Sequence, residues 1–248
     1  MRNRLSIYSA IVTGTLLSGC SHYYYLPNSP NIPLLTEKGD WRASVAGYQG
    51  GGGGSNIPGI EIQGSYAVGK KVGLMASVQA VNKSDGTDYG KGSYFDLGAG
   101  YYQTNKSKHL VFEVYGVMGV GHAENGFSNL ATSKANFTKI YIQPIFGYKS
   151  KYFDAGITWR LASQHFSAIQ FSGALDSFEL DRLNAMQAQP NSFLSEPGFV
   201  LRAGVENFKI QMQVGYSYNT TRSYTIYNEV LGGGSIGIIV MMGRGKKK

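Results

Sequence analysis

Residues 208–218 read FKIQMQVGYSY, and polar and apolar side chains alternate along most of this stretch. Successive side chains of a β-strand point to opposite faces of the sheet. One face therefore carries only apolar and aromatic residues, and the other carries Lys209, Gln211 and Gln213. The pattern predicts a strand that lies between two different environments, one apolar and one polar.

The same alternation recurs from Trp41 almost to the end of the chain. It predicts ten strands, at about 40–49, 57–68, 71–81, 92–104, 109–122, 136–149, 152–162, 197–207, 208–219 and 233–243. No second apolar segment is long enough to cross a bilayer as a helix. Strands with one apolar face can cross a membrane only as a closed barrel, because an open sheet edge leaves backbone groups unpaired in lipid. The predicted fold is all-β: an antiparallel up-and-down transmembrane β-barrel of about ten strands over residues 40–243.

The polar face of these strands is expected to line the lumen. Its charged members form a predicted lumen network: Arg42, Glu61, Asp96, Glu113, Lys139, Asp154, Arg160, Arg202, Glu206 and Lys209. Acids and bases in one lumen can pair across strands and fill it, which is favoured over a permeation path because an unpaired buried charge is costly. A soluble sandwich or lipocalin-type barrel, with the apolar face inside, is the alternative.

The connections between the strands alternate in length. Residues 69–70, 104–108, 149–151 and 207 form short turns, and residues 50–56, 82–91, 123–135, 163–196 and 220–232 form long loops. Outer-membrane barrels have short periplasmic turns and long external loops. The short turns are therefore expected in the periplasm. In loop 163–196, Asp176-Ser177-Phe178-Glu179 predicts a reciprocally capped helix over about 177–189, ended by Pro190, which serves as a lid or docks a partner.

Aromatic residues on the apolar face are predicted to form two interfacial girdles. The set expected near the short turns is Trp41, Tyr66, Tyr101, Tyr148, Phe153 and Phe208. The set expected near the long loops is Phe95, Phe137, Trp159, Phe199, Tyr216 and Tyr218.

The amino terminus has the layout of a secretory signal, with Arg2 and Arg4 before a short apolar run. It ends in Leu17-Ser18-Gly19-Cys20, which resembles a bacterial lipobox. The resemblance implies a lipoprotein signal peptide at 1–19, acylation of Cys20, and, since Ser21 is not Asp, export to the outer membrane. Residues 20–39, rich in Pro, Asn and Ser, are expected to be an extended tether. With the tether and the basic tail 244–248 on the short-turn side, the lipid is expected in the periplasmic leaflet.

The chain resembles outer-membrane barrel proteins of Gram-negative bacteria in general, without matching a functional family. The net charge of +8 is scattered over turns and tail, and an exported chain does not meet the chromosome, so no nucleic-acid partner is expected. No spaced His or Cys set predicts a metal, and no cofactor is expected. His122 and His165 are weak catalytic candidates, because neither lies in a known motif.

The favoured function is therefore that of an outer-membrane lipoprotein with a structural or accessory role, expected to be a subunit of a larger envelope complex. Its expected partners are the bilayer and other envelope proteins, the latter through loop 163–196. A barrel that already spans the membrane does not need a lipid anchor to stay there. A lipid on Cys20 would therefore serve to position the protein relative to a partner. The alternatives are a narrow channel for small solutes or ions and an omptin-like or lipid-modifying surface hydrolase.

Overall fold

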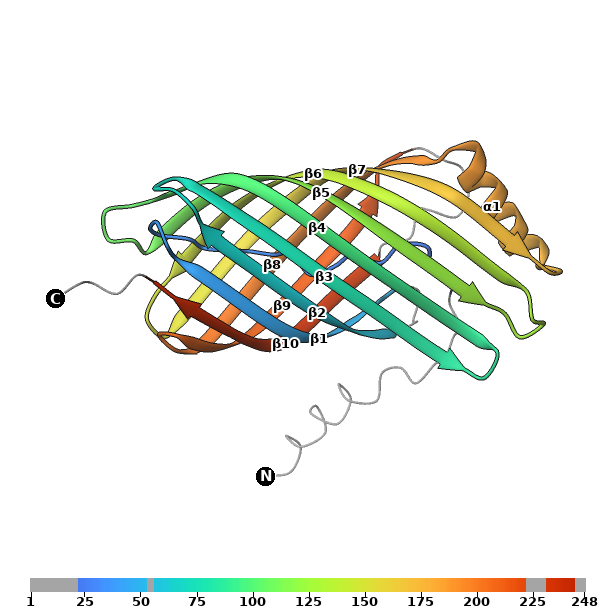
Figure 1. Ribbon diagram of the computed structural model, residues 1–248, viewed down its shortest axis with the longest axis horizontal. Helices are drawn as coiled ribbons and strands as arrows, with labels where there is room; N and C mark the ends of the chain where they lie inside the picture. The colour runs from blue at the N-terminus through green and yellow to red at the C-terminus, as the bar shows by residue number, and fades with distance from the viewer. Residues whose placement is uncertain (1–21, 53–55, 222–230, 244–248) are drawn as a thin grey trace, which may run out of the picture.

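The computed structural model describes residues 22–52, 56–221 and 231–243 as a closed barrel of ten antiparallel strands (Figure 1). Each strand pairs with its neighbours in sequence, and β1 pairs with β10 to close the ring. The strands are β1 (Trp41–Gly51), β2 (Ile57–Ala67), β3 (Val72–Asp85), β4 (Asp88–Thr104), β5 (Leu110–Gly126), β6 (Thr132–Lys149), β7 (Phe153–Ser172), β8 (Asn191–Val205), β9 (Phe208–Asn219) and β10 (Leu231–Met242). The predicted fold class is confirmed. In the described part of the chain, no helix has the length and hydropathy needed to cross a bilayer.

Several strands extend further toward the long loops than the sequence predicts. β7 continues to Ser172 and β8 begins at Asn191, so the loop expected at 163–196 shrinks to 173–190. The expected strands end close to the end of their apolar face. On β7 the outward residues directly beyond Leu161 are Ser163 and His165, yet the pairing with β6 continues past them to Ser172. Backbone pairing is therefore longer than the apolar band.

The outward face of the barrel is an apolar band. Met118 is 60 % exposed, Ile236 is 65 % exposed, and apolar side chains recur at every second position of the strands. On β7 the band runs from Phe153 to Leu161. At about 3.3 Å per residue and a strand tilt of about 40°, this corresponds to a height of about 20 Å, near the apolar height of outer-membrane barrels.

Phe137 is the exception among the expected girdle residues. It is 4 % exposed and packs inside the barrel, 5.5 Å from the ring of Tyr25 and 5.7 Å from that of Tyr94. Its assignment to the lipid face was wrong, because Phe137 has the same parity on β6 as the inward Lys139. The other expected girdle residues lie on the outward faces of their strands.

The largest departure from the sequence prediction concerns residues 22–36, which we call the N-terminal segment. Residues 23–35 are all buried, and the segment runs through the interior of the barrel (Figure 1, blue). The expected position of the tether, on the short-turn side of the barrel, is wrong for these residues, because they lie inside the barrel. Their Pro, Asn and Ser composition suits an extended chain, and composition does not tell whether such a chain lies in solvent or in a polar lumen.

Helix α1 (Ser177–Ala188) lies between β7 and β8, as predicted. The Asp176 side chain accepts a hydrogen bond from the backbone N–H of Glu179 at 2.8 Å, which caps the first turn. The expected reciprocal contact from Glu179 is replaced by another one. The Glu179 carboxylate is buried and accepts a hydrogen bond from the Tyr24 hydroxyl at 3.3 Å, so the helix faces the N-terminal segment.

Candidate functional site: the lumen and its N-terminal segment

The N-terminal segment crosses the lumen from the long-loop end to the short-turn end. At its start, His22 Nε2 lies 2.9 Å from Asp88 Oδ1 and 3.0 Å from the carbonyl of Gly126, at the ends of β4 and β5 that face the long loops. After its end, Asp40 lies 3.5 Å from Lys149 at the short turn between β6 and β7. Residue 22 is therefore at one mouth of the barrel and residue 40 at the other.

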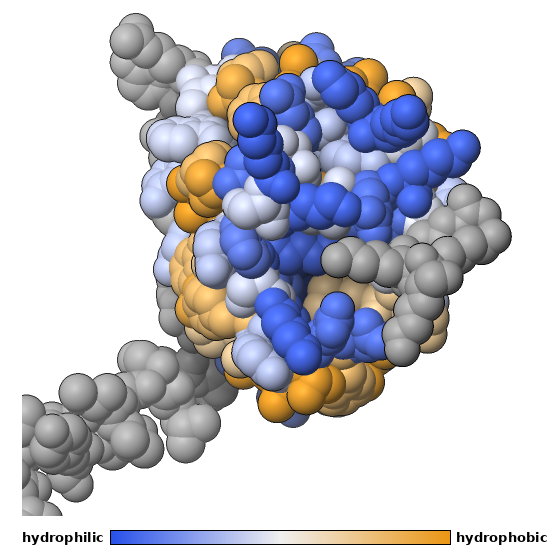
Figure 2. Space-filling view, turned by 90° about the vertical axis from the view of Figure 1, so that its left-hand side faces the viewer, coloured by the Kyte–Doolittle hydropathy of each residue, from blue (hydrophilic) through white to orange (hydrophobic). Residues whose placement is uncertain are grey.

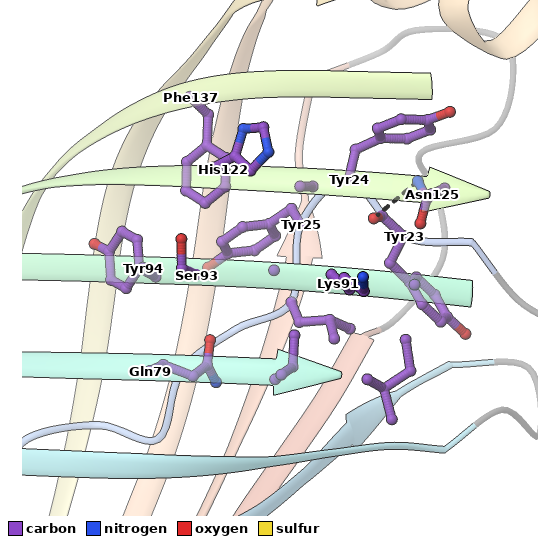
Figure 3. A pocket seen from close by; sticks show the side chains of 16 residues that line it. Tyr23, Tyr24, Tyr25, Gln79, Lys91, Ser93, Tyr94, His122, Asn125 and Phe137 are labelled. Atoms are coloured by element: carbon purple, nitrogen blue, oxygen red, sulfur yellow. Dashed lines mark hydrogen bonds between the residues drawn. The ribbon is translucent and has the colours of Figure 1, made fainter. Parts of the chain in front are cut away.

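Three consecutive tyrosines hold the segment near the long-loop mouth (Figure 3). The Tyr23 hydroxyl donates to the carbonyl of Gly52 at 2.6 Å, and the Tyr24 hydroxyl lies 2.6 Å from Ser133 Oγ. The Tyr25 hydroxyl donates to Glu196. Each ring thus points to a different part of the barrel wall, which fixes the segment laterally as well as along the axis.

A buried charge cluster lies at the level of Tyr25. Glu196 Oε2 is 2.6 Å from Lys139 Nζ and 3.0 Å from Arg160 Nε, and all three side chains are almost completely buried. Lys139 also donates to the Tyr25 hydroxyl at 2.6 Å. One carboxylate therefore forms ion pairs with two cations, and the cluster binds the segment through a tyrosine.

The middle of the segment is held through its backbone and its short polar side chains. Arg160 donates to the carbonyl of Asn28 at 2.8 Å and to its side-chain oxygen at 2.9 Å. The backbone N–H of Ser29 donates to Glu61 at 2.7 Å. The Asn31 amide donates to the strand carbonyls of Gly64 and Ala76, at 3.2 and 3.0 Å. An extended chain leaves its backbone groups unpaired, and here the barrel wall supplies the partners.

Near the short turns, two arginines and one glutamate bind the backbone. Arg42 and Arg202 both donate to the carbonyl of Ile32. The N–H groups of Leu34 and Leu35 donate to the two oxygens of Glu113, at 3.0 and 2.7 Å. Leu34 has φ 55°, and this left-handed conformation aims consecutive N–H groups at one carboxylate. The inward charges therefore recognise the segment rather than a free solute.

The inward strand faces hold five buried cations and five buried carboxylates. They are Arg42, Lys139, Arg160, Arg202 and Lys209, with Glu61, Asp96, Glu113, Asp154 and Glu196. Nine members of the predicted lumen network are in this set. Lys209 and Asp154 form an ion pair at 2.6 Å. The formal charges inside the lumen cancel, which lowers the cost of burying them.

Two residues distinguish this set from the predicted one. Glu206 is exposed in the turn between β8 and β9, so its placement in the lumen was wrong. Glu196 was missed, because the eighth strand was expected to begin at residue 197. It has the same parity on β8 as Arg202, so continuing the alternation past Pro197 would have found it.

Helix α1 closes over the start of the segment. Arg182 donates to the carbonyl of His22 at 2.7 Å, and its guanidinium lies 5.1 Å from the centre of the Tyr24 ring. Leu183 and Met186 are buried in the apolar cluster that also contains Tyr24 and Leu194. The helix is therefore part of the long-loop mouth and contacts the segment directly.

The space left around the tyrosines is small. Two cavities border Tyr24 and Tyr25, and each has a volume of about 30 Å³, enough for one or two water molecules (Figure 3). A larger cavity of about 180 Å³ lies at the short-turn end, next to Leu35 and Asp40. The segment and the strand side chains thus leave little free space beside Tyr24 and Tyr25.

The two candidate catalytic histidines lie outside the lumen. His122 Nδ1 is 2.7 Å from Asn136 Oδ1, and His165 Nδ1 is 2.8 Å from Asn191 Oδ1. Both rings are exposed on the outward face near the long loops. His122 Nε2 is 4.0 Å from Glu124, which itself pairs with Lys134 at 3.3 Å. Within the described residues, no group of three His, Cys, Asp or Glu side chains could hold a metal ion.

No protein-family model and no curated protein matches the chain. Among solved structures, the translocator domain of the autotransporter NalP from Neisseria meningitidis is 12 % identical, with a TM-score of 0.44 over 82 % of this chain and 88 % of that one. Ail, the attachment invasion locus protein of Yersinia pestis, is 13 % identical, with a TM-score of 0.34 over 83 % of this chain and 99 % of that one. Similarity at this level gives no information about the function of this chain.

The architecture of the chain itself is that of an outer-membrane barrel. Its strands close into a ring, its outward face is an apolar band bordered by aromatic side chains, and its interior is polar. Outer-membrane β-barrels combine these three features.

Proposed function

We propose that the protein is a lipid-anchored β-barrel of the outer membrane that carries its own amino terminus through the membrane and displays it at the external surface. The observation that supports this is the path of residues 22–36 through the lumen. Long loops are external in outer-membrane barrels, and His22 lies at the long-loop mouth. The role is structural: the barrel is a closed membrane anchor for what lies at its surface.

This proposal replaces the expected position of the lipid. A periplasmic anchor assumed that the chain between Cys20 and Trp41 stays on the short-turn side. Cys20 lies outside the described residues, but it precedes His22 by only two positions, a reach of about 7 Å. An acyl group on Cys20 would therefore lie on the external side of the membrane and not on the periplasmic side.

The contacts within the lumen favour a closed barrel over the alternative of a narrow channel. A channel needs a continuous wet path, whereas the lumen charges bind the segment and each other. The hydrolase alternative gains no support from His122 and His165, because each faces outward and is paired with an asparagine. An accessory role in a larger complex remains part of the proposal, with α1 and the neighbouring strand ends as the surface for an envelope partner.

Mass spectrometry of the mature protein tests the lipid anchor. We expect the mature chain to begin at Cys20 and to carry diacylglyceryl and acyl groups on that residue. Cys20→Ala should abolish the modification. Cleavage at another position, or an unmodified Cys20, would remove the anchor from the proposal and leave the barrel and its segment in place.

A further inference from the structure

The short turns of the barrel carry an excess of positive charge. Three turns that follow each other around the ring have two lysines each: Lys70 and Lys71, Lys106 and Lys108, and Lys149 and Lys151. We call these six residues the turn lysines. The fourth short turn carries Glu206 instead, so the lysines cover one side of this end. Figure 2, which faces the short-turn end, shows hydrophilic side chains gathered there inside an apolar rim.

The long-loop end has the opposite balance. Its described cations are Lys83, Lys91, Lys134 and Arg182, and its described carboxylates are Asp85, Asp88, Glu124, Asp176, Glu179 and Asp181. The buried lumen charges cancel, so they add no net charge to either end of the barrel. The net charge is therefore positive at the short-turn end and negative at the long-loop end, and the positive charge comes from the turns.

Most turn lysines have no acidic partner. Lys108 pairs with Glu37, and Lys149 lies 3.5 Å from Asp40. Lys70, Lys71, Lys106 and Lys151 are exposed, and none of them has a carboxylate within ion-pair distance among the described residues. Four uncompensated cations thus remain available to a ligand.

The positions of these lysines relative to the lipid face indicate the ligand. Lys71 Nζ lies 5.6 Å from the centre of the Tyr101 ring, and Lys151 Nζ lies 5.4 Å from that of Tyr152. Both rings are exposed, and Tyr101 belongs to the girdle near the short turns. Lysines beside interfacial aromatic residues place their stems on apolar surface and their ammonium groups at headgroup depth.

We propose that the turn lysines bind the phosphate groups of anionic phospholipids in the leaflet next to the short turns. A soluble polyanion or an acidic protein would be met best by a compact patch that faces away from the membrane. Here two of the four unpaired lysines, Lys71 and Lys151, lie beside exposed aromatic rings, where headgroup phosphates are within reach. Attraction of basic residues to an anionic leaflet acts within this range.

The proposal is tested with the full-length protein in nanodiscs of phosphatidylcholine and phosphatidylglycerol. Native mass spectrometry then counts the lipids retained on the barrel. We expect the wild-type protein to retain phosphatidylglycerol preferentially, and the preference to fall about fivefold or more in K70Q/K71Q/K106Q/K151Q. K91Q/K134Q, which removes two lysines at the long-loop end, is the control and should keep the preference. Raised salt should weaken retention in the wild type.

Two results would overturn the proposal: no preference for phosphatidylglycerol in the wild type, or an equal preference in the quadruple variant. Binding of the wild type to isolated peptidoglycan or to an acidic protein, without a lipid preference, would assign the lysines to that ligand instead. Heat-modifiable mobility on gels verifies that each variant is folded. If the quadruple variant does not fold, K71Q/K151Q replaces it, with a smaller loss expected.

Discussion

At the residue scale, the charge balance of the lumen depends on Glu196. It is the only described carboxylate that forms ion pairs with both Lys139 and Arg160, and it also accepts a hydrogen bond from Tyr25. Glu196→Gln would leave two buried cations facing a neutral amide. Breaking a buried ion pair costs about 3–5 kcal/mol. We therefore expect a loss of this order in the free energy of unfolding, measured by urea titration of the barrel in detergent or lipid.

Glu206→Gln is the matched control for this variant. Glu206 was expected in the lumen, but it is exposed in the turn that follows β8, the strand of Glu196. Its substitution should change the free energy of unfolding by less than about 0.5 kcal/mol. Equal stability of the two variants would contradict the assigned role of Glu196.

The residue scale also shows what alternation alone can predict. Inward charges such as Lys139 and Arg202 are evident from the sequence, because a charge in the middle of a strand cannot face lipid. Phe137 and Glu196 were misplaced because parity was not followed along the whole strand. Phe137 lies where β6 extends past the apolar band, and Glu196 directly precedes Pro197, where the eighth strand was expected to begin.

At the element scale, the N-terminal segment is the part of the fold that was not predicted. The ten strands and α1 have local signals, in the alternation and in the Asp176 cap. The segment has none, because most of its contacts are with side chains far away in the sequence, such as Asn28 with Arg160 and Leu34 with Glu113. The lumen charges were predicted to pair with one another across the strands. Several of them, such as Glu113, Arg160 and Arg202, instead bind the N-terminal segment.

Replacing residues 23–35 with a Gly-Ser linker of equal length tests the segment as a plug. The linker lacks Tyr24, Tyr25 and the asparagine side chains that anchor the segment. We expect the variant to conduct ions in planar bilayers, because the lumen is no longer packed, and the wild type to remain closed. Conductance by the folded wild type, or a folded variant that is equally closed, would show that the segment does not seal the lumen.

At the scale of the whole molecule, the two ends of the barrel are chemically different. The long-loop end has α1, a majority of acidic residues and the start of the N-terminal segment, and the short-turn end has the turn lysines. The position of the N-terminal segment inside the barrel has one consequence for folding. The segment must be inside before β1 and β10 pair, because a closed ring would require it to be threaded.

The central claim is that the amino terminus lies at the external surface. An epitope inserted directly before His22, in the full chain on intact cells, tests it by antibody binding and flow cytometry. A second epitope in the turn between β4 and β5, at Ser107, is the control for the periplasmic side. We predict that the epitope before His22 is detected on intact cells and the one at Ser107 only after the outer membrane is permeabilised. Detection of the epitope before His22 only after permeabilisation would contradict the account.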